Sequence, residues 1–488
     1  MLIKCNRPTL RGRICMPSTF SFILKPDLVF SMHAKQQKIH FIAIGGSVMH
    51  SLAVALKEAG HHVTGSDDEA FEPSRSTLAK HGLLPEKEGW TPEKLNASID
   101  LVILGMHARP DNPELLQAKK LGLTIKSFPE YIYEQSIDKQ RIVIAGSHGK
   151  TTITAIVVHV LKYFHRDFDY VLGARIAGLD NTVRLSNAPI IVIEGDEYPS
   201  SPLDATPKFL RYQHHVGVIS GISWDHVNAF PSEEDYVKQF DIFADNTPKS
   251  GVLIYSEQDS LALMIGKKER EGIVQVVYKT HAHTQDANGN CFLTAGKERY
   301  PIQLFGNHNF QNLSAAKEVL KKIGITPEQF FEAIPSFKGA EGRLEKIREN
   351  GSTAVYKDFA HAPSKAKATV KALKEIFPAR ELVACLELHT YSSLNKDFLP
   401  QYKDSLKAAQ LPVVYVNPEK TKAKGLEAIA EADIRSAFGL PSLQVFTDAA
   451  TLEQFLLQQS WKNKNLLIMS SGNLGGLDVH TLAEKIVA

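Results

Sequence analysis

Short apolar runs alternate with stretches of helical spacing along most of this chain. The first run, at residues 40–44, leads directly into two glycines, and apolar positions between 52 and 59 then recur at the spacing of a helix. A second run at residues 62–67 ends on an acidic residue. The order of strand, glycine turn, helix, strand and acid predicts the first unit of a nucleotide-binding, Rossmann-type sheet. The glycines lack the strict dinucleotide spacing, so a plain turn without a ligand stays open on these residues alone.

The alternation continues to the C-terminus and indicates parallel sheets covered by helices. A run at residues 101–104 ends in a polar loop at 105–113, where open sheets of this class place ligands. Further apolar runs stand at residues 141–145, 189–194, 216–222, 382–386, 413–416 and 466–469. We therefore expect an α/β protein.

The length divides this α/β chain into domains. With 488 residues and about 150 residues per domain, we expect about three. The motifs of the chain, and not its length, give their bounds. We expect a Rossmann-like N-terminal domain at residues 32–139 and a Rossmann-like C-terminal domain at 336–488. Between them, the glycine-rich loop at residues 146–152 indicates a central domain of the P-loop ATPase type, with a mostly parallel sheet, at 140–335. Residues 1–31 are expected to be a leader that is disordered or precedes the true start, with a short targeting segment as the alternative.

Composition excludes several classes of protein. Hydrophobic residues make up 43% and charged residues 23%, which is the balance of a globular chain and not of a disordered or fibrous one. The formal net charge of +2 predicts no nucleic-acid partner and no anionic membrane partner. Four cysteines, including Cys5 and Cys15, cannot form a disulfide framework and suit a reducing compartment.

A glycine-rich loop between an apolar strand and a helix carries the strongest chemical signal. It reads Gly-Ser-His-Gly-Lys-Thr-Thr at residues 146–152. In such a loop, backbone N–H groups converge on phosphates, Lys150 adds a cation and the Thr151 hydroxyl can bind Mg²⁺. Ile144 stands where the standard Walker pattern has its first glycine, so the loop is a shortened variant. We expect ATP or another nucleoside triphosphate here.

Two further strand ends offer partners for a phosphate site. The run at residues 189–194 ends on Glu194, whose carboxylate oxygens suit Mg²⁺. Asp196 and Glu197 follow it, and they either support the metal from outside its coordination shell or are simply solvated. The run at residues 216–222 leads to His226, which is either a metal ligand or an ordinary structural histidine.

These residues together resemble the Mur ligase family. The central loop of the family reads Gly-Thr-(His/Asn)-Gly-Lys-Thr-Thr, and Ser147 in place of Thr keeps a hydroxyl. The acidic strand end of the family matches residues 194–197, and its Asp-His pair matches residues 225–226.

The resemblance continues in the second half of the chain. Residues 306–312 match the pattern Gly-x-His-Asn-x-x-Asn, and residues 337–344 match a segment that brings an arginine to the ATP phosphates. Residues 355–363 match Asp-Asp-Tyr-(Gly/Ala)-His-His-Pro, with Lys357 and Ala362 as departures. Nearly the whole chain after its first 31 residues is covered.

The resemblance implies a role for each matching position. ATP would be bound by Gly146, Ser147, His148, Gly149, Lys150, Thr151, Thr152, Asn309, Asn312, Arg343, Asp358 and His361. The catalytic residues would be Lys150, Glu194, His226 and Arg343, and the ligands of Mg²⁺ would be Thr151, Glu194 and His226. The expected contacts of the UDP-sugar are Gly45, Gly46, Ser66, Asp67, His107 and Asn112. The expected contacts of the incoming amine are His389, Thr390, Tyr391 and Ser471.

The activity that the resemblance implies is ATP-dependent formation of an amide bond in the cytoplasm, with ADP as a product. The carboxylate of UDP-N-acetylmuramate would become an acyl phosphate and then be joined to the recycled peptide L-Ala-γ-D-Glu-meso-diaminopimelate, or alternatively to L-alanine. Residues 72–78, 194–198 and 467–476 favour the peptide, whereas residues 388–393 look intermediate. The protein would be a monomer or homodimer. A P-loop ATPase switch that makes no bond is the alternative from a different class.

Overall fold

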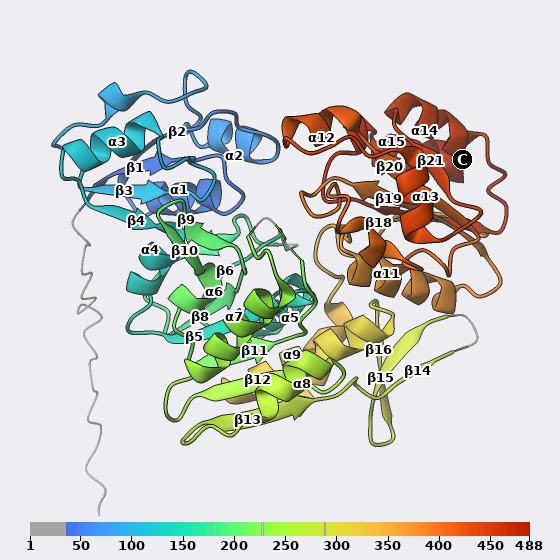
Figure 1. Cartoon of the computed structure of the whole chain (residues 1–488). Helices are drawn as coiled ribbons and strands as arrows, with labels where there is room; N and C mark the ends of the chain where they lie inside the picture. The colour runs from blue at the N-terminus through green and yellow to red at the C-terminus, as the bar shows by residue number, and fades with distance from the viewer. Residues whose placement is uncertain (1–35, 177, 226, 228, 287–288) are drawn as a thin grey trace, which may run out of the picture. The chain divides into compact units, whose positions relative to one another are not determined.

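The computed structural model describes residues 36–176, 178–225, 227, 229–286 and 289–488. The predicted leader at residues 1–31 and the predicted metal ligand His226 lie outside these residues. Three main sheets carry the described chain, and each is built from one continuous stretch of sequence. Figure 1 therefore draws them in separate colours, with the first in blue, the second in teal to green and the third in orange to red.

The first sheet has four parallel strands in the order β2-β1-β3-β4. These are β1 Lys38–Ile42, β2 His62–Ser66, β3 Leu101–Leu104 and β4 Ile125–Ser127. They alternate with α1 Met49–Glu58, α2 Ser74–Lys80, η1 Pro92–Lys94, α3 Pro113–Lys120 and α4 Phe128–Glu134. Strand β1 stops before the end of the predicted run because Ala43 adopts a left-handed φ of 66°.

The second sheet has seven strands in the order β13-β12-β11-β5-β8-β6-β7, and only β6 and β7 pair antiparallel. They are β5 Gln140–Ala145, β6 Asp169–Val171, β7 Val183–Arg184, β8 Ile190–Glu194, β11 Val216–Ile219, β12 Val252–Ser256 and β13 Val274–Tyr278. The helices of this region are α5 Lys150–Tyr163, α6 Lys208–Arg211, α7 Glu233–Asp245, α8 Ser260–Lys267, α9 Asn307–Lys322, α10 Pro327–Ala333 and η2 Ile334–Ser336. Two small antiparallel sheets accompany it, made of β9 Pro199–Ser201 with β10 Asp204–Pro207, and of β14 His283–Gln285, β15 Cys291–Ala295 and β16 Glu298–Ile302.

The third sheet has six strands in the order β17-β18-β22-β19-β20-β21, parallel except for β17 against β18. They are β17 Glu345–Glu349, β18 Ala354–Asp358, β19 Glu381–Leu388, β20 Leu411–Val416, β21 Gln444–Phe446 and β22 Lys464–Met469. The connecting helices are α11 Pro363–Ile376, η3 Leu399–Tyr402, α12 Pro418–Ala423, α13 Glu431–Phe438, α14 Ala449–Leu457, η4 Leu474–Gly476 and α15 Val479–Val487.

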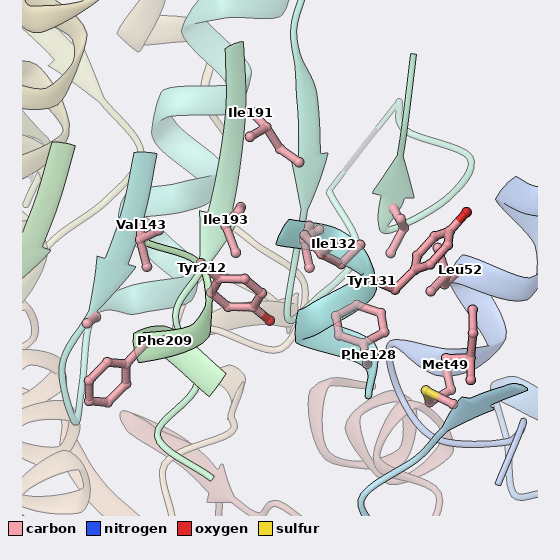
Figure 2. Close-up of a cluster of buried hydrophobic side chains, with 14 of the residues drawn as sticks. Met49, Leu52, Phe128, Tyr131, Ile132, Val143, Ile191, Ile193, Phe209 and Tyr212 are labelled. Carbon is pink, nitrogen blue, oxygen red and sulfur yellow. The ribbon is translucent and has the colours of Figure 1, made fainter. Parts of the chain in front are cut away.

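A buried cluster joins the first sheet's helices to one face of the second sheet. Figure 2 shows this cluster, in which α4 contributes Phe128, Tyr131 and Ile132, α1 contributes Met49 and Leu52, and β5 and β8 contribute Val143, Ile191 and Ile193. Burying one such large apolar side chain contributes about 1.5–3 kcal/mol, so the cluster holds α1 and α4 against the sheet that carries the glycine-rich loop.

The prediction of an α/β chain with mostly parallel sheets in three regions is confirmed. The exact domain limits, at residues 140 and 336, stay a prediction. Within the described residues, no helix combines the length and the apolar character that a membrane span requires.

Candidate active site

The glycine-rich loop lies between the end of β5 and the start of α5, as the sequence predicted. Gly149 precedes the helix with a left-handed φ of 82°, and a Cβ added there would come within 2.4 Å of the Asn312 side-chain oxygen. Gly146 is equally confined, since an added Cβ would lie 2.1 Å from the Ser220 hydroxyl. The backbone can therefore approach α9 and β11 closely, and the N–H groups of the first turn of α5 face the space above the loop.

Lys150 reaches back over the loop and is held there by an ion pair. Its Nζ donates to the Gly146 carbonyl at 2.5 Å and to Glu197 Oε2 at 2.6 Å. Burial by itself lowers the pKa of Lys150, but the carboxylates of Glu197, Asp196 and Glu194 outweigh it and raise that pKa. The acidic side chains around Lys150 therefore hold it in its charged form.

Thr151 and Glu194 form the pair predicted to hold Mg²⁺. The Thr151 hydroxyl donates to Glu194 Oε1 at 2.7 Å, and the Gly173 N–H donates to Glu194 Oε2 at 2.8 Å. No group of three or more histidine, cysteine or acidic side chains suited to a metal occurs among the described residues. A pair of oxygen donors nevertheless fits Mg²⁺, which usually takes few protein ligands and fills its shell with water and phosphate oxygens.

Arg343 comes from the segment between η2 and β17 and meets the loop. Its Nη2 donates to the Thr151 hydroxyl at 3.1 Å, and its guanidinium lies 4.5 Å from the centre of the Phe359 ring. Asp358 at the end of β18 fixes this segment, because its carboxylate accepts the N–H of Leu344 at 2.8 Å and that of Ala360 at 2.6 Å. Asp358 thus positions Arg343 through the backbone.

A cavity of about 640 Å³ opens over the loop. Its walls include most of the residues predicted to bind ATP, namely Ser147, His148, Gly149, Lys150, Thr151, Thr152, Asn309, Asn312, Arg343, Asp358 and His361, together with Glu194. The volume is within the range of about 300–1,000 Å³ that is usual for small-ligand pockets. The structure therefore brings the sequence-predicted ATP set together at one place.

The surroundings of the histidines around the cavity favour their neutral form. Burial lowers the pKa of His148. Burial, with a smaller contribution from the nearby His148 ring, lowers the pKa of His308 to about 4. Burial also lowers the pKa of His361, whose Nδ1 bonds to the Phe359 carbonyl at 2.9 Å. The fixed positive charge of the cavity therefore comes from its lysine and arginine side chains and not from imidazolium groups.

Several charged residues of the site had no clear assignment from the sequence, among them Glu197, Lys208 and Lys365. Glu197 is the buried partner of Lys150, and the acidic strand end gave a signal for it. Lys208 at the start of α6 pairs with Asp196 at 2.7 Å, and Lys365 in the first turn of α11 also lines the cavity. Neither lysine belongs to a sequence pattern that could have been recognised, since each is one of many helical lysines.

The predicted UDP-sugar residues follow the first sheet's strand ends. The Gly45 N–H donates to Asp67 Oδ2 at 2.6 Å, and Gly46 leads into α1. Burial, with a contribution from Asp68, raises the pKa of Asp67 to about 7. Asp67 also lines a smaller cavity of about 300 Å³. The glycine turn is thus organised around an acidic side chain, as the Rossmann-type pattern indicated.

Other members of that set have contacts within the protein. Ser66 is fully buried, and the Asn112 side chain caps α3 by accepting the N–H of Glu114 at 2.9 Å. His107 follows β3, and burial, with Lys208 nearby, lowers its pKa. The assignment of these residues to a sugar nucleotide stays a prediction.

The residues predicted for the incoming amine lie at the carboxyl ends of β19 and β22. His389 Nδ1 is 3.7 Å from the buried Glu387 carboxylate, and the Thr390 hydroxyl donates to Ser393 at 3.0 Å. The buried Ser471 hydroxyl has no hydrogen-bond partner among the described residues, and Tyr391 is half-buried. None of the four predicted residues lines the cavity over the glycine-rich loop.

Comparison with known protein families covers most of the chain. The Mur ligase family catalytic domain matches residues 38–139, the Mur ligase middle domain matches 144–320, and the Mur ligase glutamate ligase domain matches 342–472. All three matches therefore belong to one family and follow one another along the sequence.

Individual relatives agree with this. The UDP-N-acetylmuramate–L-alanine ligase of Aquifex aeolicus is 28% identical over 75% of this chain and 82% of its own length. The UDP-N-acetylmuramate–L-alanyl-γ-D-glutamyl-meso-2,6-diaminoheptandioate ligase of Haemophilus influenzae is 26% identical over 90% of this chain and 97% of its own. A murein peptide ligase structure from Psychrobacter arcticus shares the fold, with a TM-score of 0.65, 23% identity, and coverage of 92% of this chain and 98% of that one. The chain therefore belongs to the Mur ligase family and is an ATP-dependent, ADP-forming ligase that makes a carbon–nitrogen bond.

Proposed function

We propose that this ligase joins UDP-N-acetylmuramate to the peptide L-Ala-γ-D-Glu-meso-diaminopimelate through an acyl phosphate, a reaction of peptidoglycan recycling. The observation that carries the proposal is the meeting of Lys150, the Thr151–Glu194 pair and Arg343 at one cavity. A carboxylate reacts poorly with an amine because its oxygen is a poor leaving group. Phosphorylation by ATP removes that obstacle.

In the first step, a carboxylate oxygen of the sugar nucleotide attacks the γ-phosphorus of ATP. The bond from that phosphorus to the bridging oxygen breaks, and ADP leaves with the electron pair. Such a transfer needs positioning and charge neutralisation more than covalent chemistry. Lys150 and Arg343 supply positive charge on the protein side, and the first-turn N–H groups of α5 orient the phosphates. Thr151 and Glu194 would hold Mg²⁺, which neutralises phosphate oxygens when bound.

In the second step, the amine of the incoming L-alanyl residue attacks the acyl carbon. The amine loses its proton, the bond from carbon to the phosphate oxygen breaks, and inorganic phosphate leaves. Arg343 comes from the same C-terminal region as the predicted amine contacts. Its contact with Thr151 would therefore couple binding of the amine to completion of the phosphate site.

The surroundings of His389 support a peptide as the amine substrate. The buried Glu387 carboxylate lies beside His389. Burial lowers the pKa of His389, Glu387 acts against this, and the nearby Lys424 and Lys420 lower that pKa further. The positive charge of the two lysines suits the carboxylates of the tripeptide, which carries more of them than L-alanine does.

The relatives support two candidates. The tripeptide-ligase relative from Haemophilus influenzae aligns with 90% of this chain, whereas the L-alanine ligase of Aquifex aeolicus aligns with 75%. The sequence identity is slightly higher for the L-alanine ligase, at 28% against 26%, so L-alanine is the second candidate substrate.

A phosphate-release assay with ATP, Mg²⁺ and UDP-N-acetylmuramate tests the proposal. The tripeptide, L-alanine or no amine is added in parallel reactions. We expect release only with the tripeptide. Release with L-alanine alone would favour the second candidate, and release without any amine would contradict both.

A further inference from the structure

A lysine outside every recognised motif faces the phosphate site. Lys365 lies in the first turn of α11 and lines the ATP cavity, with 21% of its side chain exposed. Its Nζ is 3.6 Å from Asp225 Oδ2. Burial lowers the pKa of Lys365, with Asp225 and Glu197 acting against it and Lys150 and Arg343 adding to it. Lys365 is therefore near both cations to which the phosphoryl chemistry is assigned.

The sequence around Lys365 departs from the family pattern at a neighbouring position. The pattern has two successive histidines before the proline, whereas this chain has His361 followed by Ala362. Ala362 is the extended residue that directly precedes α11, and Lys365 stands three residues later in the first turn of that helix. The chain thus lacks a nitrogen-bearing side chain at 362 and has a longer, cationic one on the adjacent turn.

The other contacts of Lys365 do not account for its position. Asp225 is almost fully buried and also lies 3.7 Å from Nε2 of His361, a ring whose lowered pKa favours the neutral form, so it contacts a second side chain besides Lys365. A lysine placed only to neutralise Asp225 would not need to line a cavity that also holds Lys150 and Arg343. Lys150 keeps its ion pair with Glu197, and Lys365 and Arg343 add positive charge close to it that a phosphate group in the cavity would attract.

We infer that Lys365 is a catalytic residue whose ammonium group contacts the phosphoryl group as it passes from ATP to the substrate carboxylate. The inference rests on the proposed acyl-phosphate mechanism, whatever the amine substrate is. In the transfer, the new bond from carboxylate oxygen to phosphorus forms as the bond to the ADP oxygen breaks. Lys365 keeps its proton throughout and stabilises the negative charge on the transferring oxygens.

The test isolates this step by leaving the amine out. The full-length protein is incubated with UDP-N-acetylmuramate and with ATP that carries ¹⁸O in the bridge between the β- and γ-phosphates. Reversible acyl-phosphate formation frees the β-phosphate to rotate, so the label moves to non-bridging positions. In Lys365→Met we expect this exchange to fall about 100-fold, the usual effect of removing one group that stabilises developing charge. The KM for ATP should change little, since the contact is strongest in the transition state.

Two variants complete the test. Lys367→Met removes an exposed cation from the same helix and should exchange at the wild-type rate. Lys365→Arg keeps the charge and should exchange faster than Lys365→Met. If Lys365→Met does not fold, as judged by thermal unfolding, Lys365→Gln takes its place with the same expected loss.

The outcomes separate the inference from the proposed function. A wild-type protein with no exchange and no product from either amine would contradict the proposed function. An active wild type with full exchange in Lys365→Met would overturn the role of Lys365 alone. A second result would also overturn it. If Lys365→Met kept full isotope exchange without the amine but released no phosphate when the amine was added, Lys365 would act after the acyl phosphate forms. An arginine variant as impaired as the methionine variant would also overturn it.

Discussion

Replacing Lys150 with methionine should lower both the stability of the fold and the enzyme activity, and a second substitution should restore only the stability. Lys150 pairs with Glu197 at 2.6 Å, and only 14% and 2% of the two side chains are exposed. Methionine keeps most of the apolar stem but removes the charge. Glu197 is then a buried carboxylate without its strongest partner, although the Tyr236 hydroxyl still donates to it at 3.4 Å.

The size of the stability loss follows from this burial. Removing one partner of a buried ion pair costs about 3–5 kcal/mol, and the remaining Tyr236 contact and the open cavity favour the lower end. In the double variant Lys150→Met/Glu197→Gln the uncompensated charge is gone. Its free energy of unfolding should return to within about 1 kcal/mol of wild type, because replacing both members of a buried pair is often neutral. Activity should stay at least about 100-fold down in both variants, since the phosphates lose their lysine.

The measurement is native-state hydrogen exchange of α5, combined with phosphate release. Exchange reports the opening of this helix directly, which matters because a chain of several domains need not unfold in one transition. Lys139→Met is the matched control. It breaks another buried pair, with Asp169 at 3.2 Å, that does not line the cavity, so it should lose comparable stability and keep its kcat.

Two results would refute this reasoning. If Lys150→Met were as stable as wild type, the ion pair with Glu197 would contribute nothing to the fold. If the double variant regained activity together with stability, Lys150 would be a structural residue and not a phosphate ligand.

Three further predictions concern other parts of the two cavities. Gly149→Ala should lower kcat/KM for ATP at least about 100-fold, because its Cβ meets Asn312, whereas Gly296→Ala has a similar left-handed φ but open space around it and should be active. The raised pKa of Asp67, about 7 against an ordinary 3.8, means that the folded protein keeps a proton which the unfolded chain releases, so stability falls as pH rises through this window. Asp67→Asn should therefore have a higher free energy of unfolding than wild type in urea without ligands. This gain should be larger at pH 8 than at pH 5 by at least about 1 kcal/mol, and an equal gain at both pH values would contradict the raised pKa of Asp67. Arg343→Lys should lower kcat more than it raises the KM for ATP, because lysine cannot keep both the Thr151 contact and the stacking on the neighbouring ring; a pure KM effect in steady-state kinetics would contradict that role.

The sequence predicted the strands that are buried on both faces of a sheet. The strands at β3, β5, β8 and β22 are continuous apolar runs because helices cover them, and such runs are legible without a structure. Strand β17, with sequence EKIRE, has no such pattern, and it forms because β18 pairs with it. Its existence depends on a tertiary contact that local sequence does not encode.

Some residues of the candidate site could be predicted from the sequence and others could not, for the same reason. The sequence could place Lys150, Thr151 and Glu194 near one another because they lie at a helix start and at the end of a neighbouring parallel strand. The sequence left open whether Asp196 and Glu197 support a metal or are solvated, since it does not say which carboxylate is buried. The structure buries Glu197 and pairs it with Lys150. Lys208 and Lys365 were missed because the tertiary fold, and not a local pattern, turns these two lysines toward the cavity.

The most direct test of the central claim follows the oxygen atoms of the substrate carboxylate. UDP-N-acetylmuramate labelled with ¹⁸O in that carboxylate is incubated with ATP, Mg²⁺, the tripeptide and the wild-type protein, and both products are analysed by mass spectrometry. An acyl phosphate transfers one carboxylate oxygen to phosphate, so each amide bond formed should yield one singly labelled inorganic phosphate. Amide formation with unlabelled phosphate, or ADP formation without any amide, would contradict the mechanism.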